Sequence, residues 1–210
     1  MADKNAANLL TKRDFLKLTI ESVLIVFSVL LALGLNEFRS NYKENIQKKQ
    51  ALQKIINELQ SNLEIVREWE PYHKEVFKNL QEAQKKYTAG KDIFTVERKD
   101  LQKLMPRGVV QSLIDDTAWQ ALKASSIFAR IDFENAVTLA KIYKLQAIGV
   151  ESTINSILDV LTSRESLKKE NSRETMILLT SGFGELVSQE SFLIHYYEKT
   201  LQEFENMNKS

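Results

Sequence analysis

The chain has 210 residues, of which 27% are charged, yet its formal net charge is only +1. It therefore lacks the strong positive field with which proteins collect nucleic acid, and nucleic acid is not an expected partner. With only 2 Pro and 6 Gly, the composition disfavours turn-rich sheet folds and favours long helices, so we expect an all-α protein. The absence of Cys excludes disulfides, thiolate metal sites and a cysteine nucleophile.

The first expected element is a membrane-spanning helix. Residues 18–35 carry one charge, and their number is close to the roughly 20 apolar residues that cross a bilayer as a helix. The competing interpretation is a cleaved secretory signal, because Lys12 and Arg13 precede the run and the small residues at 32–34 resemble a cleavage site. The run is longer than a typical signal core, so we favour an anchor. The expected organisation is a short tail at 1–17, a transmembrane helix at 18–36, a helical bundle at 37–206 and a disordered tail at 207–210.

One charged residue, Glu21, lies within the apolar run. One interpretation is that its side chain reaches the lipid headgroups, because it is about one turn inside the segment. The other is that it belongs to a stripe of polar and small residues with spacings of 4, 3, 4 and 4, which places them on one side of a helix. The stripe consists of Glu21, Ile25, Ser28, Ala32 and Asn36. Such a stripe favours close packing against a second membrane helix, from another copy or another protein.

The next expected helix continues from the apolar run, bends near Pro71 and ends at the sequence TAGKD, where Gly90 is a natural stop. Its apolar residues recur at steps of 3 and 4, which is typical of one buried face. They are Leu52, Ile55, Ile56, Leu59, Leu63, Val66, Trp69, Val76, Phe77, Leu80 and Ala83. A short amphipathic piece at 96–105 and a loop at 106–108 should follow.

Three further helices are expected after this loop. The first covers 109–124, and the second is capped by Asp132 and covers 133 to about 161. Its approximate stripe is Val137, Ala140, Lys144, Ala147, Val150, Ile154 and Ile157. A polar connection at 162–173 leads to a last helix with the buried positions Met176, Leu179, Phe183, Leu186, Val187, Leu193, Ile194, Tyr197, Leu201 and Phe204. Since these stripes cannot be hidden separately, the long, coiled-coil-like helices should form an antiparallel bundle.

Two patches carry a resemblance to a known family. The first is E-x-V-L-I-x-x-x-V-L-L-A-L-x-L-N-E-F at 21–38, and the second is DTAWQALKASSIFARIDFENAVTLAKIYKLQ at 116–146. Both are similar to segments of an uncharacterised family of short bacterial single-pass membrane proteins, which is a domain of unknown function. The resemblance covers roughly a quarter of the chain and implies a membrane-anchored helical protein. It implies no activity and no site residues.

The orientation in the membrane does not follow from charge, because Lys and Arg residues on the two sides of the run balance each other. The tail ahead of the run is short, so we expect the N-terminus in the cytoplasm and the bundle in the periplasm, with the span in a bacterial inner membrane.

No catalytic or metal-binding motif is found in the sequence. A di-iron bundle needs Glu-x-x-His on two helices, and only Glu70 and His73 have this spacing, so no metal and no cofactor are expected. His73 and His195 are expected at the surface or edge of a helix, although His195 could join a buried polar cluster with the tyrosines that follow it. Asp115 and Asp116 should lie on a solvated helix end, since neighbours on a helix point in different directions.

Glycines and aromatic residues supply the remaining expectations. SGFGE at 181–185 lacks the Lys and Ser or Thr of a phosphate loop, so its glycines should allow close helix packing or a kink. Trp69 and Trp119 are expected in the core. If the bundle has a ligand pocket or an aromatic interface, it should involve Trp119, Tyr143, Tyr196 and Tyr197.

Two functions are compatible with this sequence, and neither is enzymatic. The first is a membrane-anchored interaction or accessory protein, which assembles with itself or a membrane partner through the span and with other partners through the bundle. The alternative is an extracytoplasmic bundle that senses a ligand and acts with a separate signalling partner, since the expected cytoplasmic tail is too short for an output domain.

Overall fold

The computed structural model describes residues 12–88, 98–110 and 112–209, and its regular elements in these ranges are all helical. The expected all-α class with a long apolar N-terminal helix is therefore confirmed. The chain divides into two compact units, Met1–Lys49 and Gln50–Ser210. The second unit begins shortly before the first fully buried residue, Ile55.

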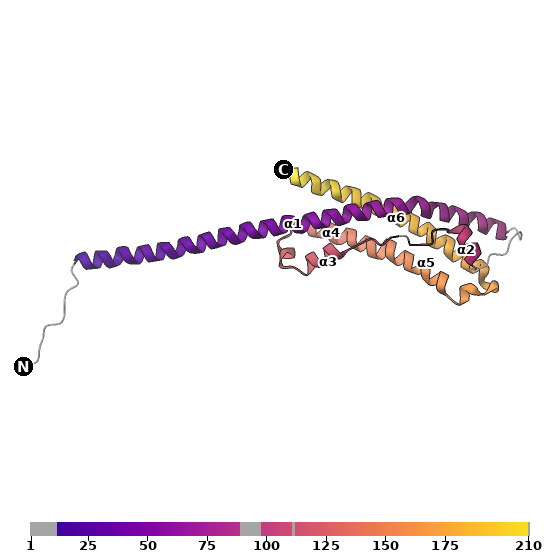
Figure 1. Cartoon of the computed structure of the whole chain (residues 1–210), viewed down its shortest axis with the longest axis horizontal. Helices are drawn as coiled ribbons and strands as arrows, with labels where there is room; N and C mark the ends of the chain where they lie inside the picture. The colour runs from indigo at the N-terminus through magenta and orange to yellow at the C-terminus, as the bar shows by residue number, and fades with distance from the viewer. Residues whose placement is uncertain (1–11, 89–97, 111, 210) are drawn as a thin grey trace, which may run out of the picture. The chain divides into compact units, whose positions relative to one another are not determined.

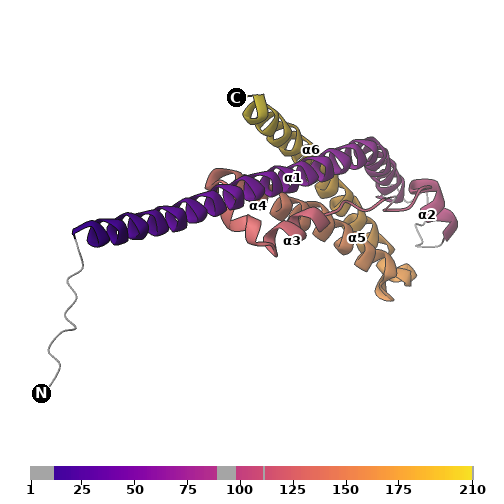
Figure 2. The ribbon, with the colours of Figure 1, turned by 60° about the vertical axis from the view of Figure 1, so that its left-hand side comes forward.

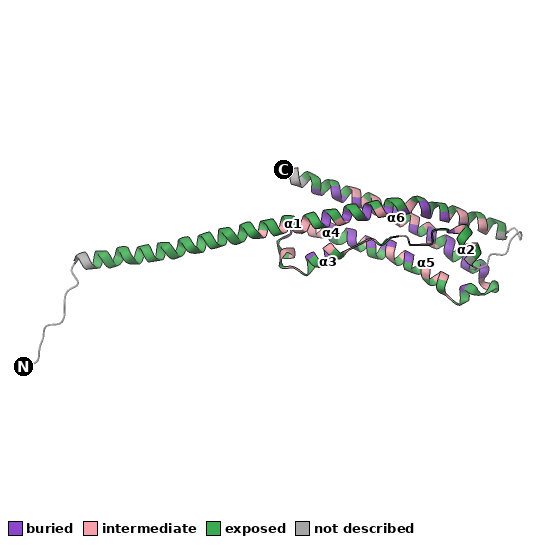
Figure 3. Cartoon of the chain, viewed as in Figure 1, coloured by how far each residue is buried: buried purple, intermediate pink, exposed green. Residues whose placement is uncertain are grey.

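Helix α1, Lys12–Thr88, contributes to both units and includes Pro71. From Phe15 to Lys43 every side chain is exposed, and Figure 3 shows this part in a continuous green. Within the described ranges α1 is the one helix long and apolar enough to cross a membrane. A wholly exposed apolar helix is unfavourable in water, so this composition fits a lipid environment. The expected stop at Gly90 lies outside the described residues.

The second unit is built around three long helical segments, which are α1 from Gln50 onward, a broken helix in the middle of the chain, and α6, Ser172–Lys209. The broken helix consists of α4, Phe133–Leu145, the π-helical turn η2, Gln146–Glu151, and α5, Ser152–Thr162. Figures 1 and 2 show α6 running in the opposite direction to the other two. The 3-10 turns η3, Glu165–Leu167, and η4, Lys169–Asn171, make the polar connection to α6.

The predicted buried faces of α1 and α6 are confirmed. On α1, the residues Ile55, Leu59, Val66, Trp69, Val76 and Leu80 are at most 2% exposed. On α6, all of the expected positions are buried except Val187 and Ile194, which are partly buried. Fully burying side chains of this size stabilises a fold by about 1.5 to 3 kcal/mol each, before conformational entropy is counted. The bundle core therefore forms mainly from these two helices and the broken helix made of α4, η2 and α5.

Asp132 caps α4 as predicted, because its Oδ1 accepts from the N–H groups of Glu134 (3.0 Å) and Asn135 (3.4 Å). The stripe predicted for this helix is wrong in its first half, since Ala140, Lys144 and Ala147 are exposed. The buried residues are Leu139, Ile142, Tyr143, Gln146, Gly149 and Val150. Gln146, a polar residue at the centre of this face, concealed the face from a search for apolar periodicity. The wider π turn also buries two consecutive residues, Gly149 and Val150.

The helix predicted over 109–124 is also wrong in its first half. Only α3, Thr117–Lys123, is helical there, and it is followed by the 3-10 helix η1, Ser126–Arg130. The loop predicted at 106–108 is confirmed and follows α2, Arg98–Leu104, and Gly108 adopts a φ of 74°, which favours glycine. We call residues 104–110 and 112–119 the strap. At the other end of the unit, α6 continues through Lys209 instead of ending before a tail at 207, since no Pro or Gly follows Gly184 in the helix.

Candidate functional site

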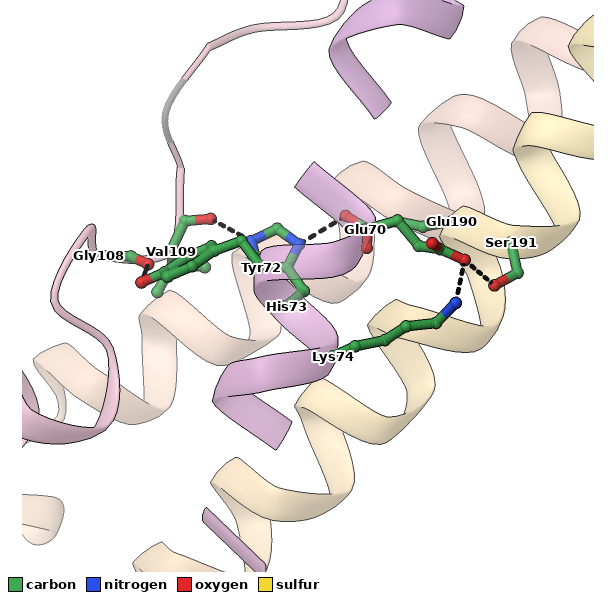
Figure 4. A network of polar contacts seen from close by, with 8 residues as sticks. All are labelled: Glu70, Tyr72, His73, Lys74, Gly108, Val109, Glu190 and Ser191. Carbon is green, nitrogen blue, oxygen red and sulfur yellow. Dashed lines mark hydrogen bonds and ion pairs between the residues drawn. The ribbon is translucent and has the colours of Figure 1, made fainter. Parts of the chain in front are cut away.

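The most unusual site in the core is a buried pair of ionisable residues, His73 on α1 and Glu190 on α6. Nδ1 of His73 lies 2.7 Å from Oε1 of Glu190, and both side chains are 0% exposed. Figure 4 shows the imidazole between this carboxylate and the strap. Burial of such groups is unfavourable unless they are paired, so this contact fixes the positions of α1 and α6 relative to each other.

The second ring nitrogen of His73 determines how the pair holds its protons. Nε2 lies 3.0 Å from the carbonyl oxygen of Val109 in the strap. A carbonyl oxygen only accepts hydrogen bonds, so Nε2 carries a hydrogen and donates it. The contact between Nδ1 and Glu190 then contains one proton, on the imidazole or on the carboxyl group. In either form the pair has no net charge.

Burial raises the pKa of Glu190, and the hydrogen bond and positive charge of His73 act in the opposite direction. The other carboxyl oxygen, Oε2, is buried and has no hydrogen-bond partner among the described residues. Such an orphaned acceptor is costly when the group is ionised. The site is thus a titratable part of the core, and its burial separates it from solutes.

A polar shell surrounds the pair at the surface of the same two helices. Glu70 on α1 accepts from Nζ of Lys74 (2.6 Å) and from the hydroxyl of Ser191 on α6 (2.5 Å), as Figure 4 shows. Partial burial acts to raise the pKa of Glu70, but these two hydrogen bonds and the charge of Lys74 lower it overall. This carboxylate therefore stays ionised above the neutralised pair.

Tyr72 attaches the strap on the other side of His73. Its hydroxyl donates to the carbonyl of Gly108 (2.9 Å) and accepts from the backbone N–H of Arg107 (3.0 Å). The guanidinium of Arg107 lies 5.0 Å from the centre of the Tyr72 ring, a cation–π arrangement. Burial raises the pKa of Tyr72, so its hydroxyl keeps its proton and can donate at neutral pH.

A second polar network lies about three turns before His73 along α1. The side chain of Asn62 accepts from the N–H of Asp115 (2.8 Å) and donates to its carbonyl (2.6 Å). Oε1 of Gln146 accepts from the Tyr197 hydroxyl (2.8 Å) and from Asn62 (3.3 Å). Three helices are thereby joined to the strap through buried amide groups. Burial also raises the pKa of Tyr197.

Glu58 connects this region with α3. Its carboxylate accepts from the N–H of Ala118 (2.6 Å), more weakly from that of Trp119 (3.4 Å), and from the hydroxyl of Tyr143 (2.6 Å). Glu58 thus provides the helix cap that Asp116 does not make. Burial and the bond to Glu58 raise the pKa of Tyr143.

The structure brings together three of the four expected aromatic residues. The rings of Trp119 and Tyr143 are stacked, with centroids 5.2 Å apart and an interplanar angle of 1°. Tyr197 joins the adjacent network through Gln146. Tyr196 instead packs on Phe192, 4.7 Å between centroids, and lines a groove on the surface.

The expectation of a surface position is wrong for His73 and is confirmed for His195. His73 is fully buried in a polar cluster, whereas His195 is exposed and contacts the edge of Tyr196. His73 has a carboxylate and a carbonyl as partners, which removes the penalty that normally keeps histidine near solvent. Asp115 is exposed just before the start of α3, at a solvated helix end as predicted, and its carboxylate accepts from the N–H and the hydroxyl of Thr117.

The glycines of SGFGE permit close packing, as predicted. A Cβ on Gly182 would lie 2.8 Å from Cγ1 of Ile157 on α5, and one on Gly184 would lie 3.0 Å from the ring of Phe77 on α1. Helix α6 therefore approaches both of its neighbours at this level. A Cβ at Gly182 would require Ile157 to move, and one at Gly184 would require a small shift of the Phe77 ring.

The expected membrane stripe lies in the first unit. Glu21, Ile25, Ser28, Ala32 and Asn36 are all exposed there. The hydroxyl of Ser28 donates to the carbonyl of Leu24 (2.7 Å), so it is satisfied within its own helix. Glu21 is the only charged residue between Leu18 and Leu35, and its interaction remains a prediction.

Sequence reasoning missed Glu58, Asn62, His73, Gln146 and Glu190. A signal was present, since each interrupts or borders an apolar stripe with a polar side chain.

Within the described ranges, no group of three or more histidine, aspartate or glutamate residues could hold a metal ion. No model of a known protein family matches the chain, and neither does any curated protein or any solved structure. The resemblance to short bacterial membrane proteins therefore stays a prediction from the two sequence patches.

Proposed function

We propose that this protein is a membrane-anchored helical accessory protein, which assembles with itself or a membrane partner through its apolar helix and with other partners through its bundle. The observation that carries the proposal is the fully exposed apolar segment from Leu18 to Leu35 with Glu21 as its only charge. A carboxyl group in a span is costly in lipid and is commonly paired with another protein group. The small residues on the same side would allow a second helix to approach closely.

The bundle supports the same proposal. Its ionisable core groups, His73 and Glu190, are closed off from solutes, so they stabilise a shape rather than act on a substrate. A rigid bundle on a membrane anchor suits the display of a surface to partners.

The test is purification of the intact protein from its native membrane in mild detergent, with identification of co-purifying proteins. Glu21→Leu should lose a stoichiometric membrane partner or self-association that the native protein retains. Thr19→Leu is the matched control, because Thr19 lies on the other side of the helix and its hydroxyl already bonds to the carbonyl of Phe15 (2.9 Å). Identical behaviour of Glu21→Leu and the native protein would contradict the proposal.

We place the span in a bacterial inner membrane with the bundle in the periplasm. Because the chain has no Cys, a single cysteine at the exposed position Gln60 can report the side of the membrane. A membrane-impermeant thiol reagent should label Gln60→Cys in cells whose inner membrane is intact. Labelling only after this membrane is disrupted would show that the bundle lies in the cytoplasm.

A second candidate function, ligand sensing, is favoured by a cleft of about 430 Å³ in the bundle. Its lining is mainly apolar and includes Trp69, Leu113 and Ile154, together with the acidic residues Asp116 and Glu151. No lysine or arginine lines this cleft in the described part of the chain, so a ligand with an apolar body and a positive charge fits it best.

Trp69 can report on this cleft. The chain has two tryptophans, so Trp119→Phe leaves Trp69 as the sole emitter. For a sensing domain we expect hexylamine to change its fluorescence saturably, whereas hexanoate should not, and Asp116→Asn should weaken the response. Equal responses to the two compounds would exclude a charge-selective site.

A further inference from the structure

A groove of about 370 Å³ lies on the bundle surface between α4 with its π turn and α6. The residues that line it are Lys141, Lys144, Leu145, Ile148, Gly149, Gln189, Phe192 and Tyr196. All of them belong to the second unit, and the core networks do not use them.

Gly149, in the π turn η2, lies at the base of the groove. A Cβ at this position would lie 2.8 Å from Oε1 of Gln189 on α6. The π turn and α6 therefore lie close together at this position, and a larger residue would require the end of the Gln189 side chain to move. π turns inside helices are frequent at functional sites.

The apolar side chains of the groove lack a covering. Ile148 is 64% exposed and Phe192 is 49% exposed, and the ring of Phe192 is held by contact with Tyr196. Single exposed apolar residues are normal, so these adjacent ones define a candidate interaction surface only together with the charges at its edge.

The charges at the edge of the groove have one sign. Lys141 and Lys144 are exposed, and no acidic residue lines the groove in the described chain. Lys141 and Lys144 would therefore lie close to the surface of a bound partner. Acidic groups would gain favourable contacts there, and basic groups would be repelled.

We propose that this groove binds an acidic amphipathic helix of a partner protein, whose apolar side covers Ile148 and Phe192 and whose carboxylates meet Lys141 and Lys144. The groove is open and its apolar side chains protrude, so it would enclose a small molecule poorly, whereas a helix can cover it with residues spaced at i, i+3, i+4 and i+7. This inference rests on the proposed interaction function and names the partner chemistry of the bundle.

The test uses the full chain in nanodiscs of zwitterionic lipid, with a fluorophore on Ser188→Cys, an exposed position next to the groove on α6. The probes are two synthetic helices with leucine at the same i, i+3, i+4 and i+7 positions, one with glutamate and one with lysine on the remaining surface. We expect the acidic helix to bind roughly tenfold more tightly than the basic helix, since two lysine contacts and the absence of repulsion act together. Added salt should reduce this difference.

Two variants and one control locate the binding. Lys141→Glu/Lys144→Glu should reverse the preference between the helices, and Phe192→Ser should weaken the binding of both. Lys78→Glu/Lys169→Glu changes the net charge equally at exposed positions outside the groove lining and should keep the native preference.

Equal affinity for the two helices, no response to either, or an unchanged preference after charge reversal in the groove would overturn the proposal. A fluorescence change on transfer to anionic nanodiscs without peptide would also overturn it, because the groove would then contact lipid. Glu21→Leu separates this inference from the proposed function, since it should remove the membrane partner and leave peptide binding unchanged.

Discussion

His73 and Glu190 are 117 positions apart in the sequence, yet their side chains meet 2.7 Å apart with no exposure to solvent. Each residue alone would be an unfavourable choice for a bundle core. Together, with the carbonyl of Val109 as a third partner, they form a contact that an alternative helix register cannot reproduce.

Removal of one member of this pair should be strongly destabilising. We expect His73→Leu to lower the free energy of unfolding by about 3 to 5 kcal/mol, because Glu190 would remain buried without a partner. His73→Leu/Glu190→Leu should cost less than His73→Leu alone. Chemical denaturation of the full chain in a mild detergent, followed by circular dichroism, measures both. A double variant that loses as much stability as His73→Leu alone, or more, would contradict the coupling of the two residues.

The pair should also make stability depend on pH. Burial raises the pKa of Glu190 above the ordinary value near 4.5, so the folded protein keeps this proton to a higher pH than the unfolded chain does. The stability from this group is therefore greatest at low pH and is lost as the pH rises through the raised pKa.

Glu190→Gln removes this titration, and its amide can donate to Nδ1 of a neutral His73. We expect the melting temperature of the variant to fall less steeply with rising pH than that of the native protein. Glu203→Gln, at an exposed position on α6, is the control and should follow the native curve. Parallel curves for the native protein and Glu190→Gln would contradict this assignment.

The limits of sequence reasoning are visible in particular residues. Regular spacing predicted the core positions of α1 and α6, and an aspartate predicted the start of α4, because periodicity and capping are local properties. His73 could not be placed in the core, because its partners come from α6 and from the strap. Gln146 was missed for the same reason, since its hydrogen bonds depend on the assembled bundle.

A tight contact near the centre of α6 gives a third prediction. Gly182→Ala should destabilise the bundle by about 1 to 3 kcal/mol despite the better helix propensity of alanine, because the new Cβ would lie 2.8 Å from Cγ1 of Ile157. Thermal unfolding measures the effect. In an Ile157→Ala background the additional loss should disappear, and its persistence would show that Ile157 is not the obstacle. Gly34→Ala, with no atom within 4 Å of the new Cβ, should be neutral or stabilising.

Glu58 should hold α3 in place. Glu58→Ala removes the acceptor for two N–H groups and for Tyr143, so we expect a loss of about 1 to 2 kcal/mol. Hydrogen exchange should be faster at Ala118 and Trp119 and unchanged in the core of α6. Glu64→Ala, at an exposed position on α1, provides the comparison. Unaltered exchange at Ala118 would show that α3 does not depend on this carboxylate.

The strap is held in an unusual way, because α1 binds its main chain. The side chains of Tyr72, His73 and Asn79 contact the carbonyls of Gly108, Val109 and Leu104, respectively. Asn62 and Glu58 bind backbone groups further along the strap. Main-chain groups are the same for almost every amino acid. Many residues of the strap are thus free to change during evolution without loss of the attachment, whereas selection to preserve it acts on five polar side chains of the facing helix.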